Sequence, residues 1–415
     1  MPGNLSLDTR LLFSTRVVRL FAYGFLSVVM VLYLAEAGLS ETQIGLLLTL
    51  ALIGDTAISL WITTHADRIG RRRMLAIGSV LMVFAGILFA FTRDFTLLLL
   101  AATIGVISPS GYEVGPFLSI EQAGLTQLEP DTHRTRVFAW YNLVGSFATA
   151  LGALCGGGLA QLLHAAGFSE LDSYRLVVTG YGLLGIALFG LFARLSPRVE
   201  AHAQPHNPGA APDGRVPFLG LGRSRRVVLG LAALFSLDAF AGGFILQSLV
   251  AYWFHQRFGV EPAMLGGIFF GANFLGGLSA LAAAWLAKRI GLISTMVFTH
   301  IPSNLLLMLL PFMPNLPAAI ALLLLRSSIS QMDVPTRQSY TMAVVDPGER
   351  SAAAGITSTA RTIGAALSPA LAAPLLANPA LMGAPFLIAG GLKIIYDLSL
   401  YRSFRALKPP EETSQ

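Results

Sequence analysis

The chain has little charge and almost no cysteine. Asp, Glu, Lys and Arg make up 12% of its 415 residues, whereas soluble domains carry about 25%. The single cysteine, Cys155, lies in an apolar, glycine-rich stretch, which excludes a disulfide framework or a cysteine metal site within one chain. Residues 1–12 lack the charged start, apolar core and cleavage site of a signal peptide. We therefore expect the first apolar segment to insert the chain into a membrane and stay there.

Motifs of catalysis and nucleotide binding are also missing. The sequence contains no Walker A loop, no dinucleotide fingerprint after a strand, no His-Glu-x-x-His and no nucleophile with an evident base partner. Its glycine-rich runs, 152–158 and 271–277, lie inside apolar segments, where close helix packing explains them better than phosphate binding. We predict that the protein is not an enzyme and uses no cofactor and no metal.

Apolar residues dominate instead. They make up 54% of the chain, and the mean hydropathy is +0.67, which indicates an all-α integral membrane protein. A membrane-spanning helix needs about 20 apolar residues. Counting such windows predicts twelve transmembrane helices, at 17–37, 43–63, 74–92, 96–120, 137–163, 174–195, 227–253, 263–286, 291–313, 317–344, 351–377 and 382–401.

A polar segment divides these helices into two groups of six. Residues 196–226 contain five prolines and few apolar residues, which predicts a flexible cytoplasmic linker between an N-terminal half, 1–195, and a C-terminal half, 227–415. Arginine and lysine gather in loops on one side of the predicted spans, and the positive-inside rule makes that side cytoplasmic. We therefore predict a protein of the cytoplasmic membrane with both termini in the cytoplasm. The net charge of +6 then indicates contact with anionic membrane lipid and not with nucleic acid.

The loop after the second predicted helix carries the most specific motif. Its sequence Ala66-Asp67-Arg68-Ile69-Gly70-Arg71-Arg72 resembles the loop between the second and third helices of major facilitator superfamily transporters. Gly70 permits a tight turn, and a carboxylate such as Asp67 can lie against a helix N-terminus and pair with arginine. The sequence departs from the family pattern at Thr63 and His65, where the family has glycine and leucine.

The two halves also resemble each other. Ala66-Asp-Arg-Ile-Gly70 corresponds to Ala287-Lys-Arg-Ile-Gly291, and Tyr112-Glu-Val114 corresponds to Met332-Asp-Val334. Two parallel six-helix repeats are what the major facilitator fold would give. The resemblance implies a secondary transporter that works by alternating access, in which helices 1, 4, 7 and 10 line a central cavity. It also implies that Asp67, Arg68, Gly70, Arg71 and Arg72 form a loop that helps to set the inward and outward populations.

Ionisable residues within the spans are the candidates for function, because a charge in the bilayer is costly. These residues are Arg19, Asp55, Glu113, Glu121, Asp238, His300, Arg326, Asp333, Arg361, Lys393 and Asp397. Four of them fall on helices that the resemblance places around the cavity: Glu113, Asp238, Arg326 and Asp333. Tyr23 and Gln247 could add polar groups to the same pathway.

The spacing of these residues predicts several ion pairs. Asp333 and Arg337 stand at i,i+4 on one helix, as do Lys393 and Asp397, so each pair could form directly. Asp238 has no basic neighbour one turn away. It either pairs across helices with Arg326 or Arg361, or it is protonated and titrates during transport. The deep charges nearly balance, which favours internal pairing over anion binding. His300 is expected to be a hydrogen-bonded packing residue.

We interpret the chain as a transporter that exports a small organic molecule in exchange for protons, with Asp238 and Glu113 as protonation candidates. The glycines at 152 and 156–158 resemble the fifth-helix motif of proton-coupled drug antiporters, although Ala153 replaces the proline of that motif and the fourth helix lacks its arginine. These departures leave open an alternative, the uptake or exchange of a small organic anion held by Arg326 and Arg361. An alternative of another class is a membrane sensor or lipid-handling protein that transports nothing.

Overall fold

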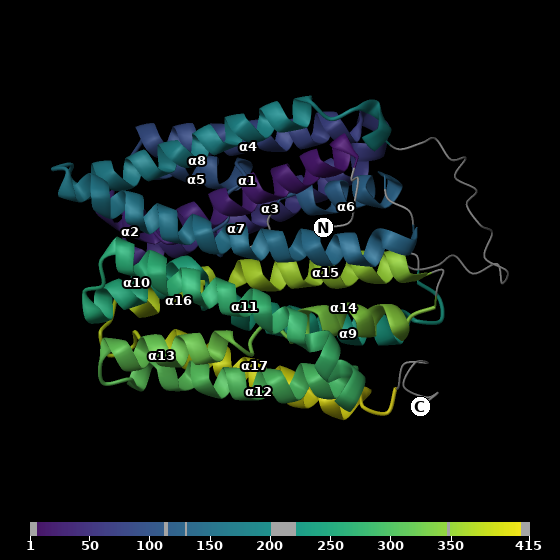
Figure 1. Ribbon diagram of the computed structural model, residues 1–415. Coiled ribbons are helices and arrows are strands. Elements are labelled where there is room, and N and C mark those ends of the chain that lie inside the picture. The colour runs from purple at the N-terminus through teal and green to yellow at the C-terminus, as the bar shows by residue number, and fades with distance from the viewer. Residues whose placement is uncertain (1–5, 112–114, 129–130, 201–220, 347–348, 408–415) are drawn as a thin grey trace. The chain divides into compact units, whose positions relative to one another are not determined.

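The computed structural model describes residues 6–111, 115–128, 131–200, 221–346 and 349–407, without the side chains of residues 67, 131–136 and 351. Most of the predicted linker, and Glu113, therefore lie outside the described residues. The secondary structure of the described part is helical (Figure 1). The helices up to the linker are α1 (Leu7–Ser27), α2 (Met30–Glu36), α3 (Glu41–Ile69), α4 (Arg71–Phe91), α5 (Phe95–Ile104), α6 (Phe117–Leu128), α7 (Asp131–Ala165), α8 (Glu170–Ala193) and η1 (Pro197–Val199).

The helices after the linker repeat this pattern of long and interrupted elements. They are α9 (Arg225–Gly243), α10 (Gln247–Phe258), α11 (Pro262–Ile290), α12 (Leu292–Leu309), η2 (Leu310–Phe312), α13 (Leu316–Ser327), α14 (Asp333–Ala343), α15 (Arg350–Leu367), α16 (Pro369–Leu376) and α17 (Ala384–Phe404). Polar residues cap the N-termini of several helices that precede the linker. Ser40 and Gln43 form a capping box at the start of α3, and Asp94 and Ser169 cap α5 and α8.

Eight helices of the described part are long and apolar enough to cross a membrane, or nine if the bent pair α1 and α2 is one span. The count of twelve spans therefore stays a prediction. Several predicted spans are not single continuous helices. The windows 17–37, 227–253 and 351–377 are interrupted at residues 28–29, 244–246 and 368, and two others contain longer breaks. The window 96–120 is broken between α5 and α6, where Gly111 and Gly115 have φ of 72° and 83°, and the window 317–344 is broken between α13 and α14. Left-handed backbone of this kind cannot continue an α-helix.

The chain packs as two compact units. The first unit consists of Met1–Ala201, Ile245–Phe274 and Pro369–Met382, and the second unit consists of His202–Phe244, Leu275–Ser368 and Gly383–Gln415. The first unit thus includes α10, α16 and the start of α11, which follow the linker in sequence. These two units are defined by contacts and differ from the two six-helix halves defined by the linker. The division into six-helix halves stays a prediction.

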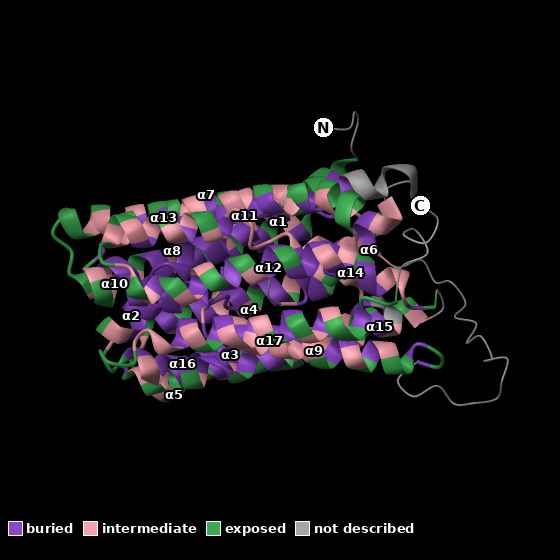
Figure 2. Cartoon of the chain, turned by 90° about the horizontal axis from the view of Figure 1, so that it is seen from below, coloured by how far each residue is buried: buried purple, intermediate pink, exposed green. Residues whose placement is uncertain are grey.

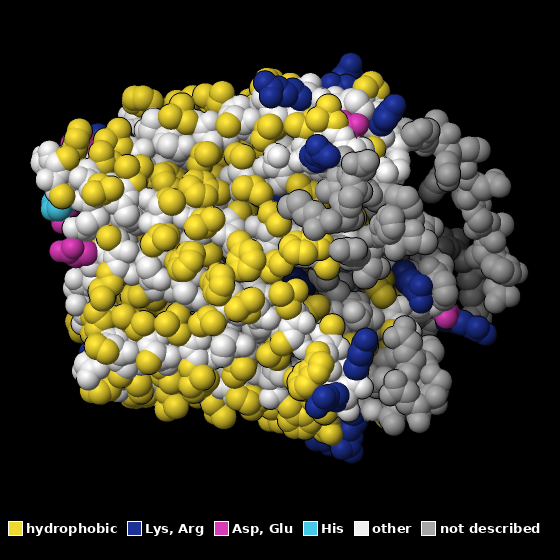
Figure 3. All heavy atoms as spheres, in the orientation of Figure 1, with side chains coloured by type: hydrophobic (Ala, Val, Ile, Leu, Met, Phe, Trp, Pro, Cys, Tyr) yellow, Lys and Arg dark blue, Asp and Glu magenta, His cyan; other side chains and the backbone are white. Residues whose placement is uncertain are grey.

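Side-chain burial follows the helical period. Buried, intermediate and exposed residues alternate along individual helices, as expected for helices with one face toward the protein interior (Figure 2). In the second unit, Phe235, Met296, Tyr340, Tyr396 and Leu400 form one apolar core. Large apolar side chains such as Trp285 and Leu398 are more than half exposed, and hydrophobic side chains are spread widely over the surface drawn in Figure 3. This distribution fits helices whose outer faces meet lipid tails.

Candidate functional site

Asp238 is the centre of a buried charge cluster in the second unit. It lies in α9 within the apolar segment Leu234–Gly243 and is 4% exposed. Lys393 Nζ lies 2.6 Å from Asp238 Oδ1. Arg337 and Arg361 reach the other oxygen, Oδ2, at 3.2 and 3.1 Å. The sequence prediction that Asp238 pairs across helices with Arg361 is confirmed, whereas Arg326 lies in the last turn of α13, outside this cluster.

Five helices supply the members of this group, which we call the Asp238 cluster. Its members are Asp238 (α9), His300 (α12), Asp333 and Arg337 (α14), Arg361 (α15), and Lys393 and Asp397 (α17). The cluster contains three carboxylates and three cationic side chains, so their charges cancel when His300 is neutral. Buried ion pairs of this kind contribute little net stability, because desolvation offsets their attraction, but removing one partner leaves an uncompensated buried charge.

The predicted pair of Asp333 and Arg337 is confirmed. Arg337 Nη1 lies 2.9 Å from Asp333 Oδ2 and binds Asp238 as well, so Arg337 bridges two carboxylates. Asp333 is the first residue of α14, where the helix dipole also favours a negative charge. The spacing at i,i+4 found this pair because both residues lie on one helix face.

The predicted pair of Lys393 and Asp397 is wrong. Lys393 binds Asp238, and Asp397 instead accepts hydrogen bonds from His300 Nδ1, at 2.9 Å, and from Asn304 Nδ2, at 3.3 Å. The physical reason is that α17 packs against both α9 and α12, so each side chain has a partner on a different neighbouring helix. His300 is hydrogen-bonded, as expected, but its Nε2 also lies 4.0 Å from Asp238 Oδ1.

The cluster has one accessible member. The side chain of Arg361 is 33% exposed, whereas the side chains of Asp238, Arg337 and Lys393 are no more than 10% exposed. Arg361 is therefore the member that a molecule outside the second unit can reach first.

The first unit contains a separate buried ion pair, which the sequence interpretation did not assemble. Arg19 donates from both terminal nitrogens to the two oxygens of Glu121, each at 2.7 Å, and both side chains are fully buried. Thr15 donates to the same carboxylate at 2.7 Å, and Tyr141 donates to it as well. These contacts join α1, α6 and α7. Both charged residues were visible as intramembrane charges, but their separation in sequence gave no sign that they meet.

Two further pathway candidates lie in the first unit. Tyr23 is fully buried in α1. Gln247, at the start of α10, donates to Ser27 Oγ at 2.7 Å and accepts from Asn273 Nδ2 at 3.1 Å. Ser27 is the last residue of α1 and Gln247 is the first residue of α10, so this polar contact joins the ends of two helices. Glu113, the remaining residue of the predicted pathway, lies outside the described residues.

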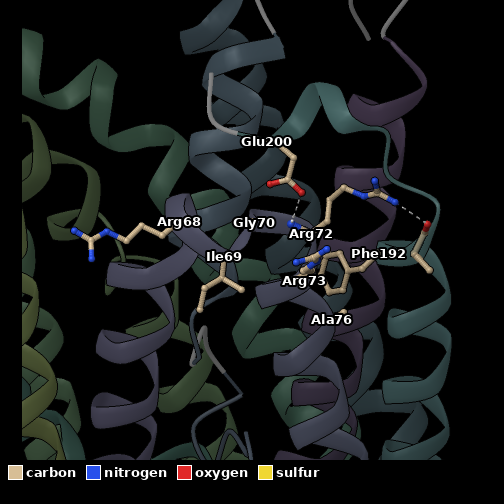
Figure 4. A pocket seen from close by; sticks show the side chains of 9 residues that line it. Arg68, Ile69, Gly70, Arg72, Arg73, Ala76, Phe192 and Glu200 are labelled. Atoms are coloured by element: carbon tan, nitrogen blue, oxygen red, sulfur yellow. Dashed lines mark hydrogen bonds between the residues drawn. The ribbon is translucent and has the colours of Figure 1, made fainter. Parts of the chain in front are cut away.

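The arginine-rich loop is held by a residue that the sequence interpretation missed. Gly70 has φ of 111°, which only glycine adopts readily, and it separates α3 from α4. The carboxylate of Glu200 accepts a hydrogen bond from the backbone N–H of Arg71, at 2.6 Å. It accepts a second from the backbone N–H of Arg72, at 3.4 Å, which Figure 4 shows. The Asp67 side chain lies outside the described residues. Glu200 thus caps the N-terminus of α4 with its carboxylate, and the role of Asp67 stays a prediction.

The same loop borders an open pocket in the first unit. Its lining includes Arg68, Arg72, Arg73 and Glu200. Figure 4 shows that Arg68 extends away from Glu200, while Arg72 reaches the carbonyl oxygen of Ala193, at 3.3 Å. Arg71 also donates to Gln127, at 2.9 Å. The loop is therefore fixed to the ends of α6 and α8.

Comparison with known proteins agrees with this architecture. A model of the Major Facilitator Superfamily matches residues 12–369. The chain is 31% identical over 419 residues to the uncharacterized membrane protein YJR124C of Saccharomyces cerevisiae, covering 95% of this chain and 93% of that protein. It is 25% identical over 145 residues to the quinolone resistance protein NorA of Staphylococcus aureus, covering 35% of this chain and 36% of NorA. The fold matches the crystal structure of a D-xylose-proton symporter with a TM-score of 0.72 at 16% identity, over 95% of this chain and 97% of that one. The chain is therefore a multi-pass membrane protein that belongs to the major facilitator superfamily of transporters.

Proposed function

We propose that the protein exports a small organic molecule across the cytoplasmic membrane in exchange for protons, with the Asp238 cluster as the coupling element. The observation that carries this proposal is the contact of buried Asp238 with three cationic side chains from three other helices. Charges buried in a membrane protein are costly and are typically kept for ion or proton pathways. A cluster with balanced charge is sensitive to one added proton, because the proton leaves it with a net charge in a low-dielectric interior.

Two relatives support parts of this proposal. NorA is named for quinolone resistance, which is consistent with export, and one neighbour in fold is a symporter of D-xylose and protons. The fold is thus compatible with proton coupling.

Contacts within the first unit support alternating access. Gln247 binds Ser27, Tyr252 donates to Glu41 at 3.0 Å, and the N–H of Ala370 donates to Thr49 at 3.0 Å. Each contact joins a residue before the linker to a residue after it. Glu41 begins α3, at the helix end opposite the Arg71 loop. We infer that these contacts close the outer side of the transport pathway and break when it opens outward.

The Arg71 loop belongs to the same cycle in this proposal. We expect Asp67→Asn to slow transport about tenfold while the dissociation constant for substrate changes little, because the loop would set the balance of conformations and not contact substrate. Uptake rates and equilibrium binding measured on the same preparation test this. Asp94→Asn is the matched control, because asparagine caps a helix as well as aspartate does. Equal losses of binding and transport in Asp67→Asn would contradict a role in switching.

The exposure of Arg361 favours a second candidate, the uptake or exchange of a small organic anion. An anionic group could compete with Asp238 for the accessible guanidinium of Arg361, with Arg326 as a further cation of the second unit. This candidate needs no proton movement.

The experiment that separates the two candidates is a substrate screen in proteoliposomes with a pH-sensitive dye inside. Cationic, neutral and anionic compounds are added outside, and their uptake is measured together with the internal pH. Proton-coupled export predicts a pH change with one chemical class of compound. Uptake of an anion without any pH change would overturn it and support exchange.

A further inference from the structure

The imidazole of His300 lies between two carboxylates of the Asp238 cluster. Its Nδ1 is 2.9 Å from Asp397 Oδ1, and its Nε2 is 4.0 Å from Asp238 Oδ1. His300 is 5% exposed and Asp397 is fully buried, so both are held within the second unit. No other element of the described cluster places a histidine beside Asp238.

The hydrogen bond to Asp397 determines which nitrogen can take up a proton. The oxygens of an ionised Asp397 can only accept hydrogen bonds, so we assign the hydrogen to Nδ1 of His300. In the neutral ring, Nε2 then has the free lone pair, and this lone pair lies on the Asp238 side. The Asp397 contact thus orients His300 in the way that a carboxylate orients a metal-binding or catalytic histidine.

We propose that His300 Nε2 is the proton-binding atom of the Asp238 cluster and that Asp397 is its positioning residue. This inference rests on the proposed function and names the site at which the coupled proton binds. The step adds one proton to a lone pair, breaks no bond within the protein, and turns a neutral ring into an imidazolium. Histidine is the side chain whose charge ordinarily changes between about pH 5 and 8.

The added proton changes the contacts of Asp238. Lys393 Nζ binds Asp238 Oδ1 at 2.6 Å, and this is the oxygen that His300 Nε2 faces. Protonated His300 and Lys393 therefore compete for one oxygen, while Arg337 and Arg361 share the other. The cluster then carries one excess positive charge. We infer that the excess positive charge weakens the ion pair between Asp238 and Arg361. Because Arg361 is the accessible member of the cluster, this change links proton binding to the surface that substrate can reach.

Charged and titratable groups on neighbouring helices surround His300. Those of α17 are Lys393, Tyr396 and Asp397, and the Tyr396 ring meets the imidazole edge-to-face with centroids 6.0 Å apart. Helix α9 contributes Asp238, α14 contributes Asp333 and Arg337, and α15 contributes Arg361 through Asp238. Arg326 of α13, which also packs against α12, lies outside the cluster.

The direct test is nuclear magnetic resonance of the full chain labelled with ¹⁵N-histidine in lipid nanodiscs. The chain has seven histidines, and the signals lost in His300→Gln assign the ring. We expect the neutral ring with hydrogen on Nδ1 at high pH and the imidazolium at low pH, within the pH range over which the protein stays folded. If His300→Gln does not fold, His300→Asn supplies the assignment. A ring that keeps one protonation state throughout this range overturns the proposal.

Transport measurements give the second readout. We expect His300→Gln to reduce substrate-driven proton movement at least tenfold while exchange of labelled for unlabelled substrate continues. His255→Gln is the matched control, because His255 is also hydrogen-bonded, to Val260, but lies in the first unit. A wild-type ratio of protons to substrate in His300→Gln would overturn the proposal. If the wild-type protein moves no protons with any substrate, proton-coupled export itself fails, whereas the titration of His300 is still measured independently.

Discussion

In each unit, one carboxylate accepts hydrogen bonds from backbone N–H groups at the start of a helix. Both sites lie at the helix ends where the arginine-rich loops are. Glu200 caps α4 in the first unit. In the second unit, Glu349 accepts hydrogen bonds from the backbone N–H groups of Gly222, Arg223 and Ser224, at 2.8, 3.0 and 3.0 Å, just before α9 begins. Each cap lies far in sequence from the helix it serves, so each fixes a loop as well as a helix end.

Glu349 gives a pH-dependent prediction. Desolvation acts to raise the pKa of Glu349, but the three backbone hydrogen bonds outweigh it and hold the pKa below its ordinary value. A lowered pKa stabilises the fold above the unfolded-state value of about 4.3, and this contribution disappears as the pH falls through the lower folded value. We therefore expect Glu349→Gln to lower the Tm by a constant amount above about pH 5, and by less as the pH falls below about 4.

Thermal unfolding of wild type and Glu349→Gln across this pH range checks the prediction. Glu36→Gln is the control, because Glu36 is exposed at the end of α2. A Tm difference between wild type and Glu349→Gln that grows toward low pH would contradict the capping role.

The sequence predicted the local pair of Asp333 and Arg337 and the distant pair of Asp238 and Arg361, but it gave wrong partners for Lys393 and Asp397. The pair of Asp333 and Arg337 was predictable because helical spacing alone brings the two side chains together. The same rule was wrong for Lys393 and Asp397, because it cannot see that neighbouring helices offer competing partners. Glu200 was not predictable as a cap of α4, since 129 residues separate it from Arg71.

At the scale of elements, hydropathy located apolar segments but not the breaks inside them. The window 96–120 contains Pro109, Gly111, Gly115 and Pro116, and the helix is interrupted there. Those residues were a usable signal, because proline and left-handed glycine both end helices. Apolar composition reports only whether a segment can enter lipid, and a broken helix in a protein interior is as apolar as a continuous one.

Glycine contacts between α1 and α7 give the prediction for this scale. A methyl group on Gly156 would overlap the Phe25 carbonyl oxygen, whereas one on Gly158, on the same helix, would meet nothing within 4 Å. We expect Gly156→Ala to destabilise the fold by about 1–3 kcal/mol, because the two helices must separate. Gly158→Ala should be neutral or stabilising, since alanine favours helices by about 1 kcal/mol over glycine.

Unfolding in detergent, followed by circular dichroism, measures both variants of α7. Equal stability of Gly156→Ala and Gly158→Ala would show that α1 and α7 do not pack as closely as the structure describes.

At the scale of the whole molecule, the orientation in the membrane follows from the arginine-rich loops. With Cys155→Ser as background, a single cysteine at position 168 or 198 reports on the two sides, because Phe168 and Arg198 are both exposed beyond opposite ends of α8. In right-side-out vesicles, we expect a membrane-impermeant maleimide to label Phe168→Cys and not Arg198→Cys. Inside-out vesicles should give the reverse. Labelling of Arg198→Cys in right-side-out vesicles would contradict cytoplasmic arginine loops and cytoplasmic termini.

The central claim is that the Asp238 cluster couples protons to substrate, and the most direct test compares proton movement in wild type and Asp238→Asn. The substrate found in the proteoliposome screen is used, with pH dye inside and Asp94→Asn as the control for the same chemical change outside the cluster. Asp238→Asn leaves three cationic side chains without their shared carboxylate, so we expect substrate-dependent proton movement to disappear. Asp94→Asn should keep it. Wild-type proton movement in Asp238→Asn would contradict the account.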